Sequence, residues 1–326
     1  LSLAGKRHND RLRFNLPPQP DSAQREYYFC LEASDEPRIA LWKSSADAHG
    51  AGAYHLAGQP QAGDLYFRTQ ADYSLQQALA SLLAGARRHA WPLAASLLVL
   101  FAPGYLAFRA LIPAHAPFEA SNLAIILALS LSLWPLLFLW ASLLRLSICP
   151  LLAGAICLAG VIALLRDART HLKLGRPSGY GLALLALTGL SLAVRFVQIR
   201  DLVLPVWVDS LHQTVITRLM AESGRLPTSY RPFAEVDSFY RHFGFHALAA
   251  VFSWLSGLSA PQSVLALGQI LNGLSPLPSY LIASRLSRSR LAGVVAACIT
   301  ALISLMPAYY VSWGRYTQLA GMLILP

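Results

Sequence analysis

Acidic and imidazole side chains gather in one segment of this chain. Residues 91–326 hold only seven carboxylates, and five of them lie in the segment 200–245: Asp201, Asp209, Glu222, Glu235 and Asp237. His212, His242 and His246 belong to the same segment or to its edge. A carboxylate can take a proton from a hydroxyl as a general base, and an imidazole can orient such a group. Because ionisable groups beside membrane segments are costly and tend to mark function, we predict a functional site here.

Asp209 has two explanations, and the residues alone leave both open. The stretch "DSLHQTVITRLMAESG" is typical of an amphipathic helix that stops at Gly224. Asp209 is then either the N-cap of this helix, worth about 1 kcal/mol, or a catalytic base. Asn caps a helix as well as Asp does but cannot take a proton, so Asp209→Asn separates the two. His212, one turn further, either orients the Asp209 carboxylate or hydrogen-bonds the loop.

The stretch "RHFGFH" places two histidines four residues apart. That spacing can bind zinc on a helix, but a zinc peptidase needs Glu after the first His, and Phe243 stands there. We therefore favour a chain without metal or other cofactor. Arg241, His242 and His246 are instead predicted to contact substrate at the membrane interface.

A single arginine stands out in "YYVSWGRYTQLAGM" (309–322). Arg315 follows an apolar stretch on the side that our topology places outside, although arginine near spanning helices prefers the cytoplasm. It is either a snorkelling side chain in an aromatic belt or an anion site, because a guanidinium can pair two oxygens of a phosphate. In the second case Tyr316 and Gln318 are predicted to help bind the substrate.

The composition is that of a polytopic membrane protein. Of the 326 residues, 55% are hydrophobic and 13% charged, against about 25% charged in soluble domains. The net charge of +10 comes from dispersed arginines without a basic run, so nucleic acid is not an expected partner. A span needs about 20 apolar residues, and the candidate spans are 90–111, 122–144, 148–165, 179–199, 262–284 and 291–312.

The segments before the first span have another character. Residues 1–72 contain short aromatic and β-branched runs such as "RIALWKS", "GAYHLAG" and "GDLYFRT", which predict a partial β-sandwich. Residues 73–89 predict an amphipathic linker helix. The chain begins without methionine and ends inside an apolar run, so we expect it to be cut from a longer protein at both ends.

Arginine positions predict the orientation of the transmembrane domain 90–326. The basic segments 166–177 and 285–290 are both cytoplasmic if the β-domain is extracytoplasmic and 244–258 does not cross the membrane. That stretch is too short for a span and fits a helix lying in the interface. Residues 200–261 then form a large outer loop.

The order of these parts resembles a known family. "FYRHFGFHALAAVFSWLSGLS", "SVLALGQILNGL", the basic "SRLSRSR" and "MPAYYVSWGRY" follow one another as in polytopic glycosyltransferases of the GT-C type. Protein O-mannosyltransferases, aminoarabinose transferases and bacterial relatives belong to that type. The resemblance implies transfer of a sugar from a polyprenyl-phosphate donor to a glycan, lipid or protein acceptor at the outer face of the cell membrane.

The resemblance also implies residue roles. Asp209 is the general base on the acceptor hydroxyl, and Arg315 meets the donor phosphate. Both must then face the same aqueous side, close enough to hold one small molecule. Many members of the family carry paired acids where this chain has Asp209-Ser210, which favours the metal-independent type.

Two alternative functions remain. The chain can be a non-catalytic, membrane-anchored protein that binds glycan or assembles surface polysaccharide, and Asp209→Asn is then silent. It can also be a lipid or solute transporter, which predicts buried charges and broken spans; Arg195 is the one charge placed well inside a span.

Overall fold

The computed structural model describes the following residues: 30–31, 43–44, 54–65, 74, 76, 80, 90–113, 118–170, 178–199, 202, 204–206, 208–237 and 242–325. The chain divides into two compact units, Leu1–Ser81 and Leu82–Pro326. The second unit carries every predicted site residue.

The N-terminal unit contains short antiparallel strands. β1 (Lys43–Ser44) pairs with β4 (Asp64–Leu65), and β2 (Tyr54–Leu56) pairs with β3 (Gln59–Gln61). β1, β2 and β4 fall in the runs "RIALWKS", "GAYHLAG" and "GDLYFRT" that predicted β-structure, and β3 lies between the last two. The described residues form only two small two-stranded sheets, and the rest of the predicted sandwich, with most of the helix 73–89, lies outside the described residues.

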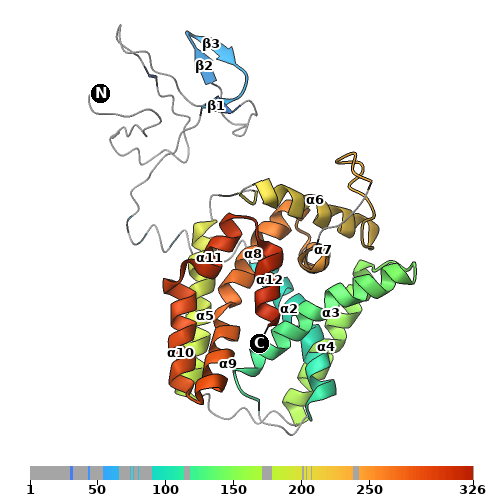
Figure 1. Cartoon of the computed structure of the whole chain (residues 1–326), viewed down its shortest axis with the longest axis vertical. Coiled ribbons are helices and arrows are strands. Elements are labelled where there is room, and N and C mark those ends of the chain that lie inside the picture. Colours follow the sequence, from blue (N-terminus) through green and yellow to red (C-terminus); the bar gives the residue numbers. More distant parts are fainter. Residues whose placement is uncertain are drawn as a thin grey trace. The chain divides into compact units, whose positions relative to one another are not determined.

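The second unit is a bundle of long apolar helices, drawn upright in Figure 1. Five described helices are long and apolar enough to cross a membrane, or six spans if a bent pair is counted as one. Four of them are α2 (Ala90–Leu111), α3 (Asn122–Leu143), α4 (Pro150–Thr170) and α5 (Gly179–Gln198). A helix pairs its own backbone groups, as lipid requires. The prediction of a multi-pass membrane protein is confirmed at this level.

The second half of the bundle is more broken. Its helices are α6 (Val208–Ser223), α7 (Gly244–Ser256), α8 (Ala260–Leu274), α9 (Pro276–Ser287), α10 (Arg290–Cys298), the π-helix η1 (Ile299–Ile303), α11 (Leu305–Ser312) and α12 (Tyr316–Ile324). The fifth candidate span is Arg290–Ser312, interrupted by η1 and by extended backbone at Ser304 and Met306.

Helix α7 corrects one expectation. It meets the α8–α9 segment at 109° and is seen nearly end-on among the upright helices of Figure 1. However, Phe245 to Phe252 are all buried, against α2, α3, α6 and α8. Protein therefore surrounds this part of α7, and the prediction of a helix lying in the lipid interface is wrong about its surroundings.

Close helix packing uses small residues, as in other membrane bundles. A Cβ on Gly104 of α2 would lie 1.9 Å from the Ile126 carbonyl oxygen of α3, and one on Gly160 of α4 would lie 2.1 Å from that of Ala102. The backbone N–H of Gly104 donates to Ser130 Oγ at 2.7 Å. Neither glycine can be replaced without moving a helix.

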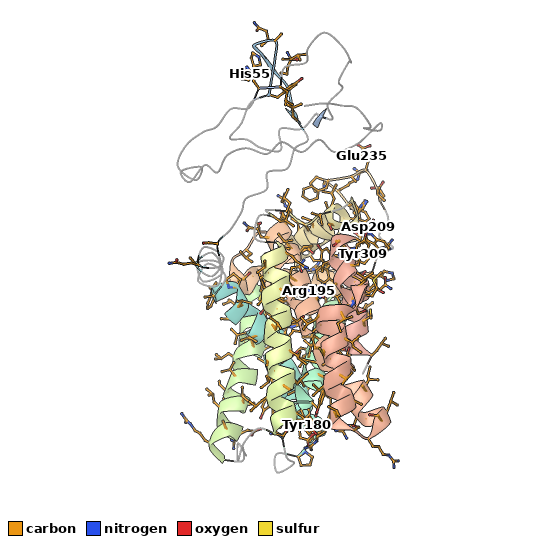
Figure 2. All side chains as sticks on the ribbon, turned by 90° about the vertical axis from the view of Figure 1, so that its left-hand side faces the viewer. His55, Tyr180, Arg195, Asp209, Glu235 and Tyr309 are labelled. Atoms are coloured by element: carbon orange, nitrogen blue, oxygen red, sulfur yellow. The ribbon has the colours of Figure 1, made fainter. Side chains whose placement is uncertain are left out.

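The two ends of the bundle differ. The loops before α3 and before α10 share one end, where Arg290 Nη2 lies 3.1 Å from Glu119 Oε1; we call it the basic end. Figure 2 shows Tyr180 at this end of the bundle and Asp209 and Tyr309 at the opposite end. The described parts of the two basic segments, 166–170 and 285–290, therefore lie away from Asp209, as the predicted topology requires.

Candidate functional site

Asp209 and Arg315 are neighbours although they are 106 positions apart in the sequence. Arg315 Nε lies 3.5 Å from Asp209 Oδ2, and the side chains are 56% and 41% exposed, respectively. Asp209 stands in the first turn of α6, and Arg315 immediately precedes α12. The predicted proximity of these two residues is confirmed.

Helix α6 begins at Val208, one residue before Asp209. Asp209 is therefore inside the first turn, and its interpretation as the N-cap is wrong. A carboxylate in this turn still interacts favourably with the positive end of the helix dipole. That interaction leaves its outer oxygens available to Arg315 or to a ligand.

Gly314 makes the meeting of the two segments possible. Its φ is +67°, and a Cβ there would lie 2.6 Å from Ser210 Oγ and 2.7 Å from the Ser210 nitrogen. Only glycine tolerates both the left-handed backbone and the close approach. The backbone N–H of Arg315 donates to the Tyr310 carbonyl at 2.8 Å. The α11–α12 junction thus packs directly against the start of α6.

The other predicted site residues are scattered. His212 and His242 are exposed, and Arg241 lies outside the described residues. Gln318 Nε2 donates to the Tyr310 hydroxyl at 3.3 Å. His246 is buried in the packing of α7, and neither ring nitrogen has a partner among the described residues. Within the described ranges, no group of three potential metal ligands occurs.

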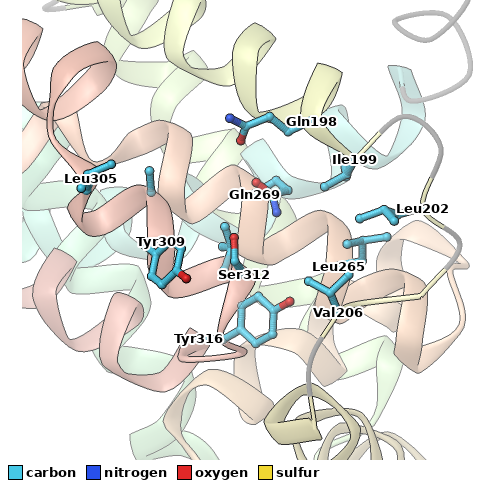
Figure 3. Close-up of a pocket in the computed structure, with 12 residues that line it drawn as sticks. Gln198, Ile199, Leu202, Val206, Leu265, Gln269, Leu305, Tyr309, Ser312 and Tyr316 are labelled. Carbon is cyan, nitrogen blue, oxygen red and sulfur yellow. The ribbon is translucent and has the colours of Figure 1, made fainter. Parts of the chain in front are cut away.

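A pocket of about 350 Å³ lies among α5, α8, α11, α12 and the segment before α6 (Figure 3). Tyr316, the residue after Arg315, lines it, and so does Val206, whose carbonyl accepts a hydrogen bond from Ser210 Oγ. Its polar lining comes from α5, α8, α11 and α12: Gln198, Gln269, Tyr309, Ser312 and Tyr316. The volume is in the range of small-molecule sites.

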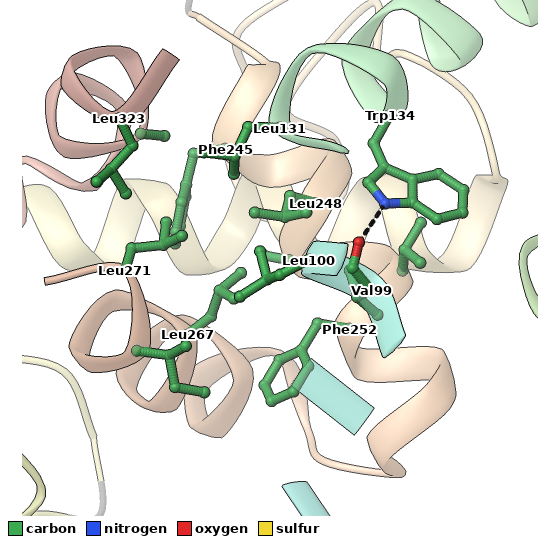
Figure 4. Packing of buried hydrophobic residues seen from close by; sticks show 14 of the residues in the cluster. Val99, Leu100, Leu131, Trp134, Phe245, Leu248, Phe252, Leu267, Leu271 and Leu323 are labelled. Carbon is green, nitrogen blue, oxygen red and sulfur yellow. Dashed lines mark hydrogen bonds between the residues drawn. The ribbon is translucent and has the colours of Figure 1, made fainter. Parts of the chain in front are cut away.

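Tyr316 is packed between Phe245 and Gly268. Its ring stacks on Phe245 with centroids 5.2 Å apart and planes at 15°, and a Cβ on Gly268 would lie 2.2 Å from it. Figure 4 shows Phe245 in the buried cluster between Leu323 and Leu248. Burial raises the pKa of the Tyr316 hydroxyl to about 12, so it stays protonated at physiological pH. Its polar neighbour is Ser210, but the hydroxyl makes no hydrogen bond of normal geometry in the described structure.

Arg195 lies close to the pocket, inside the bundle. Its Nη2 donates to the Ala301 carbonyl of η1 at 3.1 Å, and its Nη1 lies 3.5 Å from Gln198 Oε1. Asn272 Nδ2 donates to the carbonyls of Pro307 and Ala308 at 3.3 and 3.2 Å. These hydrogen bonds tie the interrupted α10–η1–α11 segment to α5 and α8.

No family model, curated protein or solved structure matches this chain. Its chemistry is therefore inferred from the arrangement of its own residues.

Of the polar residues that line the pocket, sequence reasoning named only Tyr316 and missed the other four. Gln269 and Asn272 are three residues apart inside the apolar stretch "SVLALGQILNGL", which puts them on one face of a helix. That spacing of two amides in an apolar stretch was the signal that could have identified Gln269. Gln198, Tyr309 and Ser312 carry no comparable signal, because only the tertiary fold brings them to Gln269.

Proposed function

We propose that this protein is a membrane glycosyltransferase of the GT-C type. It transfers a sugar from a polyprenyl-phosphate donor to a hydroxyl of a glycan, lipid or protein acceptor at the outer face of the cell membrane. One observation carries the proposal: Arg315 Nε lies 3.5 Å from Asp209 Oδ2 at the end of the bundle opposite to the basic end.

The pair suits the two charges that such a transfer creates. Asp209 takes the proton of the acceptor hydroxyl while the new glycosidic bond forms. The bond between the sugar and the phosphate breaks, and the Arg315 guanidinium stabilises the negative charge that develops on the leaving phosphate. Because both side chains are about half exposed, their mutual attraction is worth at most about 1 kcal/mol. Substrates can therefore separate the pair at little cost.

The residues around Asp209 suit a reaction that needs no metal ion. Ser210 stands where paired-acid relatives have a second carboxylate, and its hydroxyl is buried and donates to Val206. Arg315 supplies the positive charge that a divalent ion would otherwise bring to the phosphate.

The proposal includes an orientation. The arginine-rich basic end faces the cytoplasm, as the positive-inside rule favours, and the Asp209 end faces outward. The N-terminal unit, in this proposal part of a β-sandwich, is extracytoplasmic and presents or recognises the acceptor.

A transfer assay in membranes with a radiolabelled polyprenyl-phosphate sugar tests the activity. Asp209→Asn is expected to lower the transfer rate about 100-fold or more, and Arg315→Ala about 100-fold. Asp237→Asn and Arg231→Ala are matched controls, since they form an exposed ion pair of 2.8 Å in the same outer loop. Their rates stay at the wild-type level. Unchanged transfer in Asp209→Asn would instead favour the non-catalytic glycan-binding function.

A lipid or solute transporter is the second candidate. Buried Arg195 and the interruption of Arg290–Ser312 are features that this function predicts. Arg195, however, is bonded to the Ala301 carbonyl at that interruption, which gives it a structural role. Uptake or flipping of labelled lipid in proteoliposomes, lost in Arg195→Met but kept in Asp209→Asn, would favour transport.

A further inference from the structure

We infer that the pocket lined by Gln269 and Tyr316 binds an uncharged, hydroxyl-bearing ring, namely the sugar of the donor. This inference rests on the proposed function and assigns it a sugar subsite. The phosphate contact then belongs to Arg315, and the pocket selects the group that is transferred.

Two buried polar groups in the lining lack partners. Gln269 is 4% exposed and Tyr316 is fully buried, and neither Gln269 Oε1 nor the Tyr316 hydroxyl makes a hydrogen bond of normal geometry within the described residues. A buried polar group without a partner costs about 1–3 kcal/mol. Both groups line one cavity. A ligand hydroxyl that supplied the missing hydrogen bonds would remove this cost, and the recovered free energy would favour binding.

Gln198 is fixed in a useful orientation. Arg195 Nη1 lies 3.5 Å from its amide oxygen, which leaves the amide N–H₂ group to face other partners. The pocket thus offers an acceptor at Gln269 and donors at Gln198 and Tyr316, with the Ser312 hydroxyl able to do either. Sugar hydroxyls, which both donate and accept, match this mixture.

Other occupants fit less well. None of the described lining residues is charged, so a phosphate would find no counter-charge there. An acyl or prenyl chain would leave Gln269 and Tyr316 unpaired and would keep their desolvation cost. The apolar walls at Val206, Leu265 and Leu305 suit the carbon-bound faces of a sugar ring.

The position of the pocket agrees with transfer at Asp209. Val206 lines it three residues before Asp209, and Tyr316 lines it directly after Arg315. Gly314 seats that junction on Ser210. The pocket therefore shares its wall with the two segments that carry the proposed base and the phosphate-binding guanidinium.

Binding to the full chain in lipid nanodiscs tests the inference. The probes are polyprenyl phosphate alone and the same lipid carrying each of a panel of hexoses and pentoses. Gln269→Leu and Tyr316→Phe are each expected to weaken binding of the sugar-bearing lipid about 3- to 10-fold, the effect of one neutral hydrogen bond. Neither change alters binding of the sugar-free lipid, whereas Arg315→Ala weakens both.

Stability measurements separate this effect from misfolding. Gln269→Leu replaces an unpaired buried amide with an apolar side chain, so the melting temperature is expected to stay or rise while sugar binding falls. Gln213→Leu is the matched control, because Gln213 Oε1 is also buried without a partner but does not line the pocket. It leaves both affinities unchanged.

The outcomes distinguish the two proposals. If the phosphate lipid binds with or without sugar and the pocket variants change both affinities equally or not at all, the sugar subsite is refuted while the proposed function stands. If neither lipid binds the wild-type chain, the glycosyltransferase proposal fails.

Discussion

At the scale of single residues, the molecule brings together two side chains of opposite charge that the sequence keeps far apart. Asp209 and Arg315 are both about half exposed. A pair of this kind adds little to folding, in contrast to Arg109 and Asp167, whose atoms lie 2.7 Å apart with side chains only 11% and 15% exposed. The difference in burial gives the two pairs different roles, one at a site and one in the fold.

The first prediction compares these pairs by thermal unfolding in detergent. Asp209→Asn and Arg315→Ala are expected to change the free energy of unfolding by less than about 1 kcal/mol. Asp167→Ala leaves Arg109 unpaired in a nearly buried place, and about 3–5 kcal/mol is expected to be lost. A large destabilisation by Asp209→Asn would mean that its loss of activity has a structural cause.

At the scale of elements, one junction decides the geometry of the site. α11 ends at Ser312 and α12 starts at Tyr316, and Gly314 between them lets the chain reach the start of α6. The junction depends on the interrupted span before it, whose carbonyls are held by Arg195 and Asn272. The break in the span thus has a structural function, because it sets the position of the α11–α12 junction.

The second prediction concerns this junction. Gly314→Ala meets both a left-handed φ, which costs about 1–2 kcal/mol, and a contact of 2.6 Å with Ser210 Oγ. The junction must shift, so the transfer rate is expected to fall at least tenfold in the membrane assay. Gly189→Ala on α5 is the control, because no atom lies within 4 Å of its added Cβ. Equal rates for both variants would contradict the role of Gly314.

At the scale of the whole molecule, the two ends of the bundle define two aqueous faces. The described parts of the basic segments share one end, and Asp209, Arg315 and the pocket share the other. In the proposed function, a lipid-borne donor and a water-borne acceptor meet at the Asp209 end, because the donor stays in the bilayer.

The third prediction is a topology map with a membrane-impermeant thiol reagent on intact cells. Exposed Cys30 and Cys149 are first changed to serine. Glu235→Cys, in the outer loop, and Gln59→Cys, in the N-terminal unit, are expected to react from outside. Ser287→Cys, at the basic end, is expected to react only after permeabilisation. Labelling of positions 235 and 287 from the same side would refute the topology.

The sequence by itself determined the membrane class, most span positions and the loop where acids gather. Those features depend on hydropathy, length and charge, which are local properties of the chain. It also predicted that Asp209 and Arg315 meet, through a resemblance in the order of parts. The sequence failed at α7 because the length of a helix cannot tell whether protein or the lipid interface surrounds it.

Only the tertiary structure decided which polar residues share a cavity and which are buried without partners. Gln198, Gln269 and Tyr316 come from three helices, and His246 went into the core although its spacing suggested a ligand. The physical reason is that hydrogen-bond satisfaction depends on neighbours from distant segments. Spacing along one helix determines which residues share a face. Only tertiary packing determines which residues of other segments contact that face.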